Sequence, residues 1–197
     1  MKKIWMVAAA TTMLLQVSAQ DSSTETQTFG VMIDAHALVD VVNESLVFDL
    51  TPNTPSEAGL GLNFSANSKL DTYLNYSLML SNGGLADGSI SVKASNIKPG
   101  VKLLLQVDGT AASSLSSAVH GKMGDVVATF DKTQGSAPVE LTATDQTLIE
   151  NIGSSFTGDG NGNGYELTYI VALDDYALLD ADDGTQDVGT VTYTIAE

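Results

Sequence analysis

Apolar and polar residues alternate along several short stretches of this 197-residue chain. Apolar residues occupy every second position over 167–173 and again over 191–195. A period of two predicts a strand with one buried face. Together with less regular apolar stretches, the pattern predicts strands at 29–42, 45–50, 73–80, 89–94, 102–107, 126–130, 139–144, 165–173 and 188–195.

Turn-forming residues separate these strands, among them Asn82-Gly83-Gly84 and Asp87-Gly88. The spacing of apolar residues over 145–153 predicts one helical turn, and the Ala- and Ser-rich segment 111–121 is interpreted as a loop or a weak helix. Many short strands without long amphipathic helices predict an all-β fold. We expect an antiparallel, immunoglobulin-like β-sandwich of about 8–10 strands with long loops, formed by a single domain over 35–197.

The predicted first strand is unusually long, because its alternation runs from Phe29 to Val41. Thirteen extended residues would span on the order of 40 Å, whereas a typical strand has about 5–6 residues. Two interpretations remain open. Either the chain breaks near Ala35-His36 and switches sheets, or residues 20–34 form an N-terminal extension. In the second case Phe29, Val31 and Ile33 form a partner-binding strand that completes another subunit's sheet.

Residues 1–19 are predicted to be a secretory signal peptide. Lys2 and Lys3 precede the apolar run 4–15, and Val17-Ser18-Ala19 provides the small residues that a signal peptidase recognises. A membrane anchor is the alternative, but a span needs about 20 apolar residues. We expect export to the periplasm, cell surface or extracellular space, without membrane insertion after removal of the signal.

Charge and cysteine content narrow the possible functions. The formal net charge is −16, and the chain has neither arginine nor cysteine. Nucleic acid binding is not expected, because phosphate contacts need clustered basic residues. The lack of cysteine excludes disulfides, thiol nucleophiles and thiolate metal sites.

Two acidic segments are candidate calcium sites. Asp159, Asn161 and Asn163 alternate before Gly164, as in the first half of a calcium loop. The twelfth position, which should supply a bidentate acid, is Ile170. A plain turn needs the same glycines and asparagines, so both interpretations remain open. The second candidate site, in the long connection 174–187, comprises Asp180, Asp182 and Asp187. The alternative there is a solvated loop, and no cofactor other than Ca²⁺ is expected.

Catalysis has little support in the sequence. His36 and His120 are the only histidines, and the serines near His120 are not part of a nucleophile elbow. No pair of carboxylates stands out for glycoside cleavage. We therefore expect a protein that is not an enzyme.

Several weak motifs in a fixed order resemble a family of secreted Bacteroidota β-sandwich proteins without an established activity. They are 37–41, Asn75-Tyr76-Ser77, 97–101, 147–169 and 189–195. More distantly, the closing strand is similar to that of spore-coat-U-like and chaperone–usher pilin domains, although the disulfide that those pilins often have is absent here.

Two functions follow as expectations. The first is a non-enzymatic, exported structural or adhesive surface protein, such as a pilin-like, fimbrial subunit that binds other protein subunits and forms a homo-oligomer. The second is a stand-alone extracellular binding module for surface ligands, in a calcium-dependent form if the acidic loops bind the ion.

Overall fold

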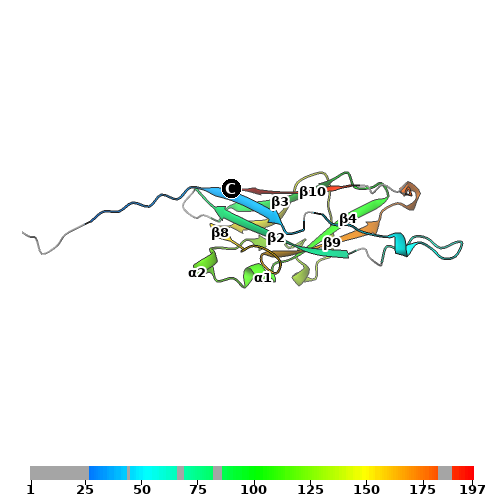
Figure 1. Ribbon diagram of the computed structural model, residues 1–197, viewed down its shortest axis with the longest axis horizontal. Helices are drawn as coiled ribbons and strands as arrows, with labels where there is room; N and C mark the ends of the chain where they lie inside the picture. Colours follow the sequence, from blue (N-terminus) through cyan, green and yellow to red (C-terminus); the bar gives the residue numbers. More distant parts are fainter. Residues whose placement is uncertain (1–26, 44, 66–68, 82–85, 182–187) are drawn as a thin grey trace, which may run out of the picture. The chain divides into compact units, whose positions relative to one another are not determined.

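Two antiparallel sheets pack face to face, so the predicted all-β sandwich is confirmed. The computed structural model describes residues 27–43, 45–65, 69–81, 86–181 and 188–197, and ten strands lie within them. Figure 1 shows β3 and β10 in one layer and β1, β2, β9 and β4 in the other.

The larger sheet has the order β1-β2-β9-β4-β6, and β8 also pairs with β2. Its central strand β9 confirms the prediction for 165–173 to the residue. The residues on one face of β9 are mostly buried, and those on the other face are buried or half-buried. The bounds are His36–Val41 for β1, Lys69–Met79 for β2, Tyr165–Leu173 for β9, Val101–Asp108 for β4, Val139–Glu140 for β6 and Ser155–Phe156 for β8.

The smaller sheet has the order β10-β3-β7-β5. Its strands are Thr190–Ala196 (β10), Gly88–Ser95 (β3), Gln146–Ile152 (β7) and Asp125–Val126 (β5). Five short helical turns complete the described structure: α1 (Thr110–Ser113), α2 (Ser117–His120), η1 (Thr51–Asn53), η2 (Lys132–Gln134) and η3 (Tyr176–Leu178). The two turns α1 and α2 confirm the weak helix expected at 111–121.

The core lies between the inner faces of the two sheets. Most inward-facing residues of the central strands are buried, which is the pattern that a sandwich requires. The largest of these are Leu74, Leu78, Ile90, Leu105, Leu148, Ile149, Ile152, Tyr165 and Leu167.

The prediction of a helical turn over 145–153 is wrong, because residues 146–152 of this segment form strand β7. Its pairing with β3 slips twice, between Gly88 and Ile90 and again between Ile90 and Ser91. Each slip adds residues to β7, as a β-bulge does, so the adjacent residues Leu148 and Ile149 are both buried. Two bulges therefore imitate the spacing of an apolar helix face.

The predicted strand 29–42 is correct only from His36 onward. His36 pairs with Met79, the last residue of β2, so β2 offers no backbone partner to earlier residues. Residues 27–35 lie in no strand, which contradicts the sheet-switching interpretation.

Three other predicted strands are shortened or missing. Residues 45–50 form no strand, although Leu46 and Phe48 pack against the core. The strand at 126–130 ends early because the Phe130 amide bonds the carbonyl oxygen of Val127. The strand at 139–144 is reduced to β6, since the Thr144 amide bonds the Thr142 hydroxyl instead of a neighbouring strand.

The chain divides into two compact units, Met1–Ile33 and Asp34–Glu197, and the sandwich belongs to the second. Of the first unit the structure describes only residues 27–33, so the predicted signal peptide lies outside the described residues. Among the described residues, no helix has the length and apolar character needed to cross a membrane.

Candidate functional site

The N-terminal segment 27–33 exposes its alternating apolar side chains. Phe29, Val31 and Ile33 are 86%, 73% and 71% exposed, and Met32 on the opposite face is 93% exposed. The segment thus has the side-chain pattern of a strand but lies in none.

Two long edge strands lie on the same side of the sandwich. Each described sheet ends in one long strand, β1 or β10, and in one strand of only two residues, β6 or β5. The long edges β1 and β10 contact each other across the sheets. The inward residues of β10 are only half-buried, namely Val191, Tyr193 and Ile195. An unpaired edge with half-covered apolar residues is a place where a further strand can add.

The glycine-rich loop 158–164 is a chain of tight turns. All four of its glycines have positive φ, and the side-chain amide of Asn163 donates to the carbonyl oxygen of Asp159 at 2.5 Å. One of the three candidate calcium ligands is thus hydrogen-bonded within the turn. Among the described residues, no group of three or more histidine, aspartate or glutamate side chains is arranged to hold a metal.

The loop is fixed to the sandwich by Asn75 of β2. The Asn75 side chain is 4% exposed, and its Nδ2 donates to the Gly160 carbonyl oxygen at 3.3 Å. Its Oδ1 has no hydrogen-bond partner. This oxygen lies against Gly164, where a Cβ would be 2.7 Å from it and closer still to the Leu74 carbonyl oxygen. The backbone of Gly164 therefore lies close to β2, and a side chain at this position would collide with it.

The acidic connection after β9 is divided between structural contacts and the second candidate site. Asp174 forms an ion pair with Lys102 at 2.8 Å, and Asp175 accepts a hydrogen bond from the Ala177 amide at the start of η3. Asp180 lines the cavity described below. Asp182 and Asp187 lie outside the described residues, so the second calcium candidate is seen only in part.

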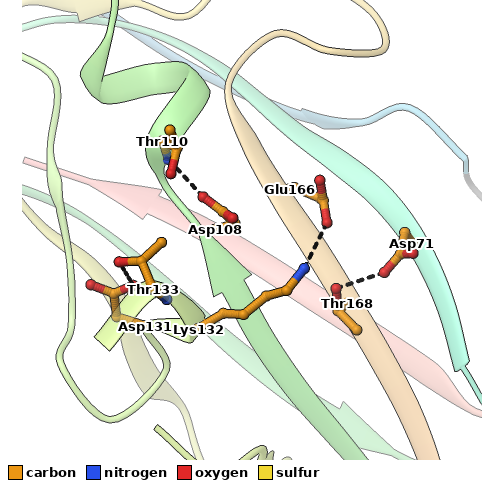
Figure 2. Close-up of polar contacts among 8 residues, drawn as sticks. All are labelled: Asp71, Asp108, Thr110, Asp131, Lys132, Thr133, Glu166 and Thr168. Atoms are coloured by element: carbon orange, nitrogen blue, oxygen red, sulfur yellow. Dashed lines mark hydrogen bonds and ion pairs between the residues drawn. The ribbon is translucent and has the colours of Figure 1, made fainter. Parts of the chain in front are cut away.

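Carboxylates from three adjacent strands gather around Lys132 (Figure 2). Glu166 of β9 accepts a hydrogen bond from Lys132 Nζ at 3.0 Å, and Asp108 lies opposite Glu166 in the β4–β9 register. Asp71 of β2 accepts a hydrogen bond from Thr168 Oγ1 at 2.6 Å. Like charges on paired strands repel, and the lysine offsets that repulsion.

The electrostatics of this cluster agree with a structural role. The hydrogen bond to Glu166 is the main cause that raises the pKa of Lys132, and the charges of Asp71 and Asp108 act in the same direction. Asp108 is also bonded, accepting from the Thr110 amide at 2.9 Å. Each of the three carboxylates thus has a partner that holds it in place. No sequence pattern predicts this cluster, because its members are 24 or more positions apart on four elements.

A cavity of about 960 Å³ lies between the sheets at one end of the sandwich. We call it the end cavity. One wall comes from the larger sheet, through Tyr169 and Val171 of β9, and another from β10, through Val191 and Tyr193. The segment 46–51 covers it, since its apolar side chains turn toward the core.

Two tyrosines in the wall of the end cavity are hydrogen-bonded to each other through their hydroxyl groups, Tyr169 from one sheet and Tyr193 from the other. Burial raises the pKa of Tyr169 to about 12 and that of Tyr193 well above its ordinary value. Both hydroxyls are therefore uncharged at neutral pH. Their mutual bond uses one of the two hydroxyl protons, which leaves the pair one further donor.

The two histidines have local partners. His36 Nε2 is 3.1 Å from Ser77 Oγ, and His120 Nδ1 is 3.1 Å from the Phe156 carbonyl oxygen. The other ring nitrogen of His36, Nδ1, is 3.4 Å from the backbone carbonyl oxygen of Asp34 and not from a carboxylate, so the described contacts of His36 and Ser77 do not include the acidic member of a triad.

Comparisons with protein-family models, curated proteins and solved structures give no significant match. The fold itself therefore defines the class, which is an all-β sandwich protein of two antiparallel sheets.

Proposed function

We propose that this chain is a non-enzymatic, exported structural or adhesive protein of the cell surface, a pilin-like subunit that binds the next copy through its N-terminal segment. One observation supports this most. Phe29, Val31 and Ile33 alternate on one face of a segment that has no strand partner and exposes them to solvent. Apolar side chains at every second position are what a donated strand inserts into an acceptor, while its backbone extends the sheet.

The edge of β10 is the acceptor that fits best. A strand added beside β10 would place Phe29, Val31 and Ile33 next to the half-buried Val191, Tyr193 and Ile195. Burial of these apolar surfaces stabilises the pair by about 25 cal/mol for each Å² removed from water. The added strand would also satisfy the backbone groups along the open edge of β10.

Deletion of residues 20–34 tests the proposal. The shortened chain should remain a folded monomer, since the exposed apolar residues make little contribution to its fold, but it should no longer form oligomers or fibres. Size-exclusion chromatography and electron microscopy measure assembly, and thermal unfolding measures folding. A wild-type protein that stays monomeric at high concentration would contradict the proposal.

A matched pair of variants tests which face of the segment matters. Val31→Asp would place a charge in the apolar contact at a cost of several kcal/mol, so assembly should be lost. Met32→Asp adds the same charge one residue away on the opposite face and should leave assembly nearly unchanged. Equal effects of the two substitutions would exclude donation in the proposed register.

The end cavity favours a second candidate function, a stand-alone extracellular binding module. A cavity of about 960 Å³ is large enough for a small ligand, since ligand pockets typically measure about 300–1,000 Å³. A calcium-dependent form of this module gains no support from the geometry of the glycine-rich loop.

A further inference from the structure

The end cavity is a large, partly open space beside the packed core. Protein interiors normally reach the packing density of organic crystals, with few voids larger than a water molecule. A volume of about 960 Å³ is roughly six times the ~150 Å³ of an apolar cavity that takes up one benzene molecule. The side chains of the two sheets and of segment 46–51 thus line a partly open space that is large enough for a molecule of about drug size.

The walls determine what such a molecule must be like. Residues from both sheets and from the covering segment line the cavity with apolar side chains, including Leu46, Phe48, Leu103, Val171 and Val191. An apolar body is favoured there, because its transfer from water gains about 25 cal/mol for each Å² buried.

The tyrosine pair supplies one polar contact in the cavity wall. One of the two hydroxyl protons forms the hydrogen bond between Tyr169 and Tyr193. The other hydroxyl proton can be donated to a ligand, and the remaining lone pairs can accept a hydrogen bond from it. A ligand with one hydroxyl or carbonyl group matches this capacity.

The charges that line the cavity disfavour an anion. Among the described residues, Asp49 and Asp180 face it together with one lysine, Lys98. The Asp49 carboxylate accepts hydrogen bonds from the Thr51 hydroxyl at 2.6 Å and from the Thr51 amide at 3.0 Å. These bonds, the hydroxyl first, lower the pKa of Asp49 and keep it ionised. A ligand carboxylate would meet an excess of negative charge, in a chain whose formal net charge is −16.

We propose that the end cavity binds a small, uncharged and largely apolar molecule that has one hydroxyl or carbonyl group. This inference concerns a site on the sandwich itself and does not depend on strand donation by the N-terminal segment. Fatty acids and other anionic amphiphiles are expected to bind more weakly than alcohols of the same chain length.

The test uses the monomeric fraction of the chain from Gln20 onward and the uncharged fluorophore phenylnaphthylamine, whose emission rises in apolar surroundings. We expect saturable binding of one fluorophore per chain, with displacement by dodecanol at lower concentrations than by dodecanoate. Tyr193→Phe should weaken dodecanol binding about two- to tenfold, the equivalent of one hydrogen bond.

Two variants are designed to narrow the cavity, and a third variant serves as their control. Val191→Trp and Ile97→Trp each place a larger side chain at a residue that lines the cavity, and each should reduce fluorophore binding at least about tenfold. Val188→Trp makes the same change at an exposed valine that does not line the cavity, so it should bind like the wild type. Thermal unfolding shows which variants fold. If one of the two cavity variants does not fold, the other is sufficient for the test.

Several results would overturn the proposal. One is the lack of saturable binding by the wild type, and another is unchanged binding in a folded cavity variant. Displacement of the fluorophore by dodecanoate, or by dodecylamine, at the same concentrations as by dodecanol would show that the cavity does not select uncharged ligands. Displacement by a peptide of residues 27–35 but not by dodecanol would assign the cavity to the N-terminal segment of another copy.

Discussion

Replacement of Gly164 by alanine should destabilise the sandwich far more than the same change elsewhere in the glycine-rich loop. Gly164 has a φ of +72°, and an added Cβ would collide with the Leu74 carbonyl oxygen of β2 and lie 2.7 Å from Asn75 Oδ1. Both atoms belong to a central strand, so neither can move without disturbing the pairing of β2 with β9.

The magnitude follows from three contributions. The left-handed backbone conformation costs a residue with a Cβ about 1–2 kcal/mol. Relief of the collision by shifts in a well-packed region costs about 1–3 kcal/mol. Displacement of Asn75 weakens its hydrogen bond to Gly160, which is worth about 1 kcal/mol. Gly164→Ala should therefore lower the free energy of unfolding by on the order of 4 kcal/mol.

Gly160→Ala and Gly162→Ala are matched controls. Both glycines have positive φ, +85° and +82°, but an added Cβ would meet no atom within 4 Å. Only the conformational cost remains, and the lower entropy of the unfolded alanine chain offsets part of it, so each control should lose about 1 kcal/mol.

Urea denaturation followed by circular dichroism measures these differences, with m-values expected to stay constant. The difference of about 3 kcal/mol between Gly164→Ala and its controls corresponds to roughly 6–12 °C in Tm for a domain of this size. Equal losses in all three variants would refute the close approach of Gly164 to β2. They would also show that the loop is selected for its backbone conformation alone.

Three further predictions concern charge, calcium and export. Lys132→Met should cost about 1 kcal/mol at neutral pH, because Glu166 loses its partner in a half-exposed cluster. The pKa of Lys132 is raised in the folded state, so the wild type should be more stable than the variant at every pH below the ordinary lysine pKa. This extra stability should be lost as the pH rises through the pKa of Lys132 in the folded protein. Equal urea midpoints of the two proteins at pH 7 would contradict the prediction. Millimolar calcium should leave Tm unchanged, whereas a rise that Asp159→Ala abolishes would support a calcium loop, since a bound ion stabilises by mass action. Mass spectrometry of exported protein should find Gln20 at the N-terminus, and a chain that begins at Met1 would contradict the predicted signal peptide.

The fold could be predicted from sequence where strands are regular. Strands β9 and β10 alternate without interruption, so their period of two was visible. Strand β7 could not be recognised, because its bulges bury the adjacent residues Leu148 and Ile149 and hide that period. The two-residue strands β5, β6 and β8 are too short to produce a pattern at all.

The candidate sites could be predicted only in part. The exposed apolar face of Phe29, Val31 and Ile33 was visible because its residues are close in sequence. The end cavity was not, because its walls come from segments 41–64, 97–103, 169–181 and 189–193, which only the folded chain brings together. The apolar residues over 46–50 were the available signal, and they were interpreted as a strand. These residues pair with no strand among the described residues, and they cover the end of the sandwich instead.

The positions of the outer ends of β1 and β10 have a mechanical consequence. His36 at the start of β1 pairs with Met79 at the end of β2, and Ala196 at the end of β10 pairs with Ser89 near the start of β3. Strand β3 follows β2 in the chain, so the start of β1 and the end of β10 lie at the same end of the sandwich. Tension applied between these two points loads the outermost hydrogen bonds of each ladder first. The bonds then break one after another, as in unzipping, whereas strands pulled from opposite ends would be sheared and would share the load. A fibre that transmitted force through these two ends would lose an edge strand at low force, while the central strands β2, β9 and β4 stayed paired.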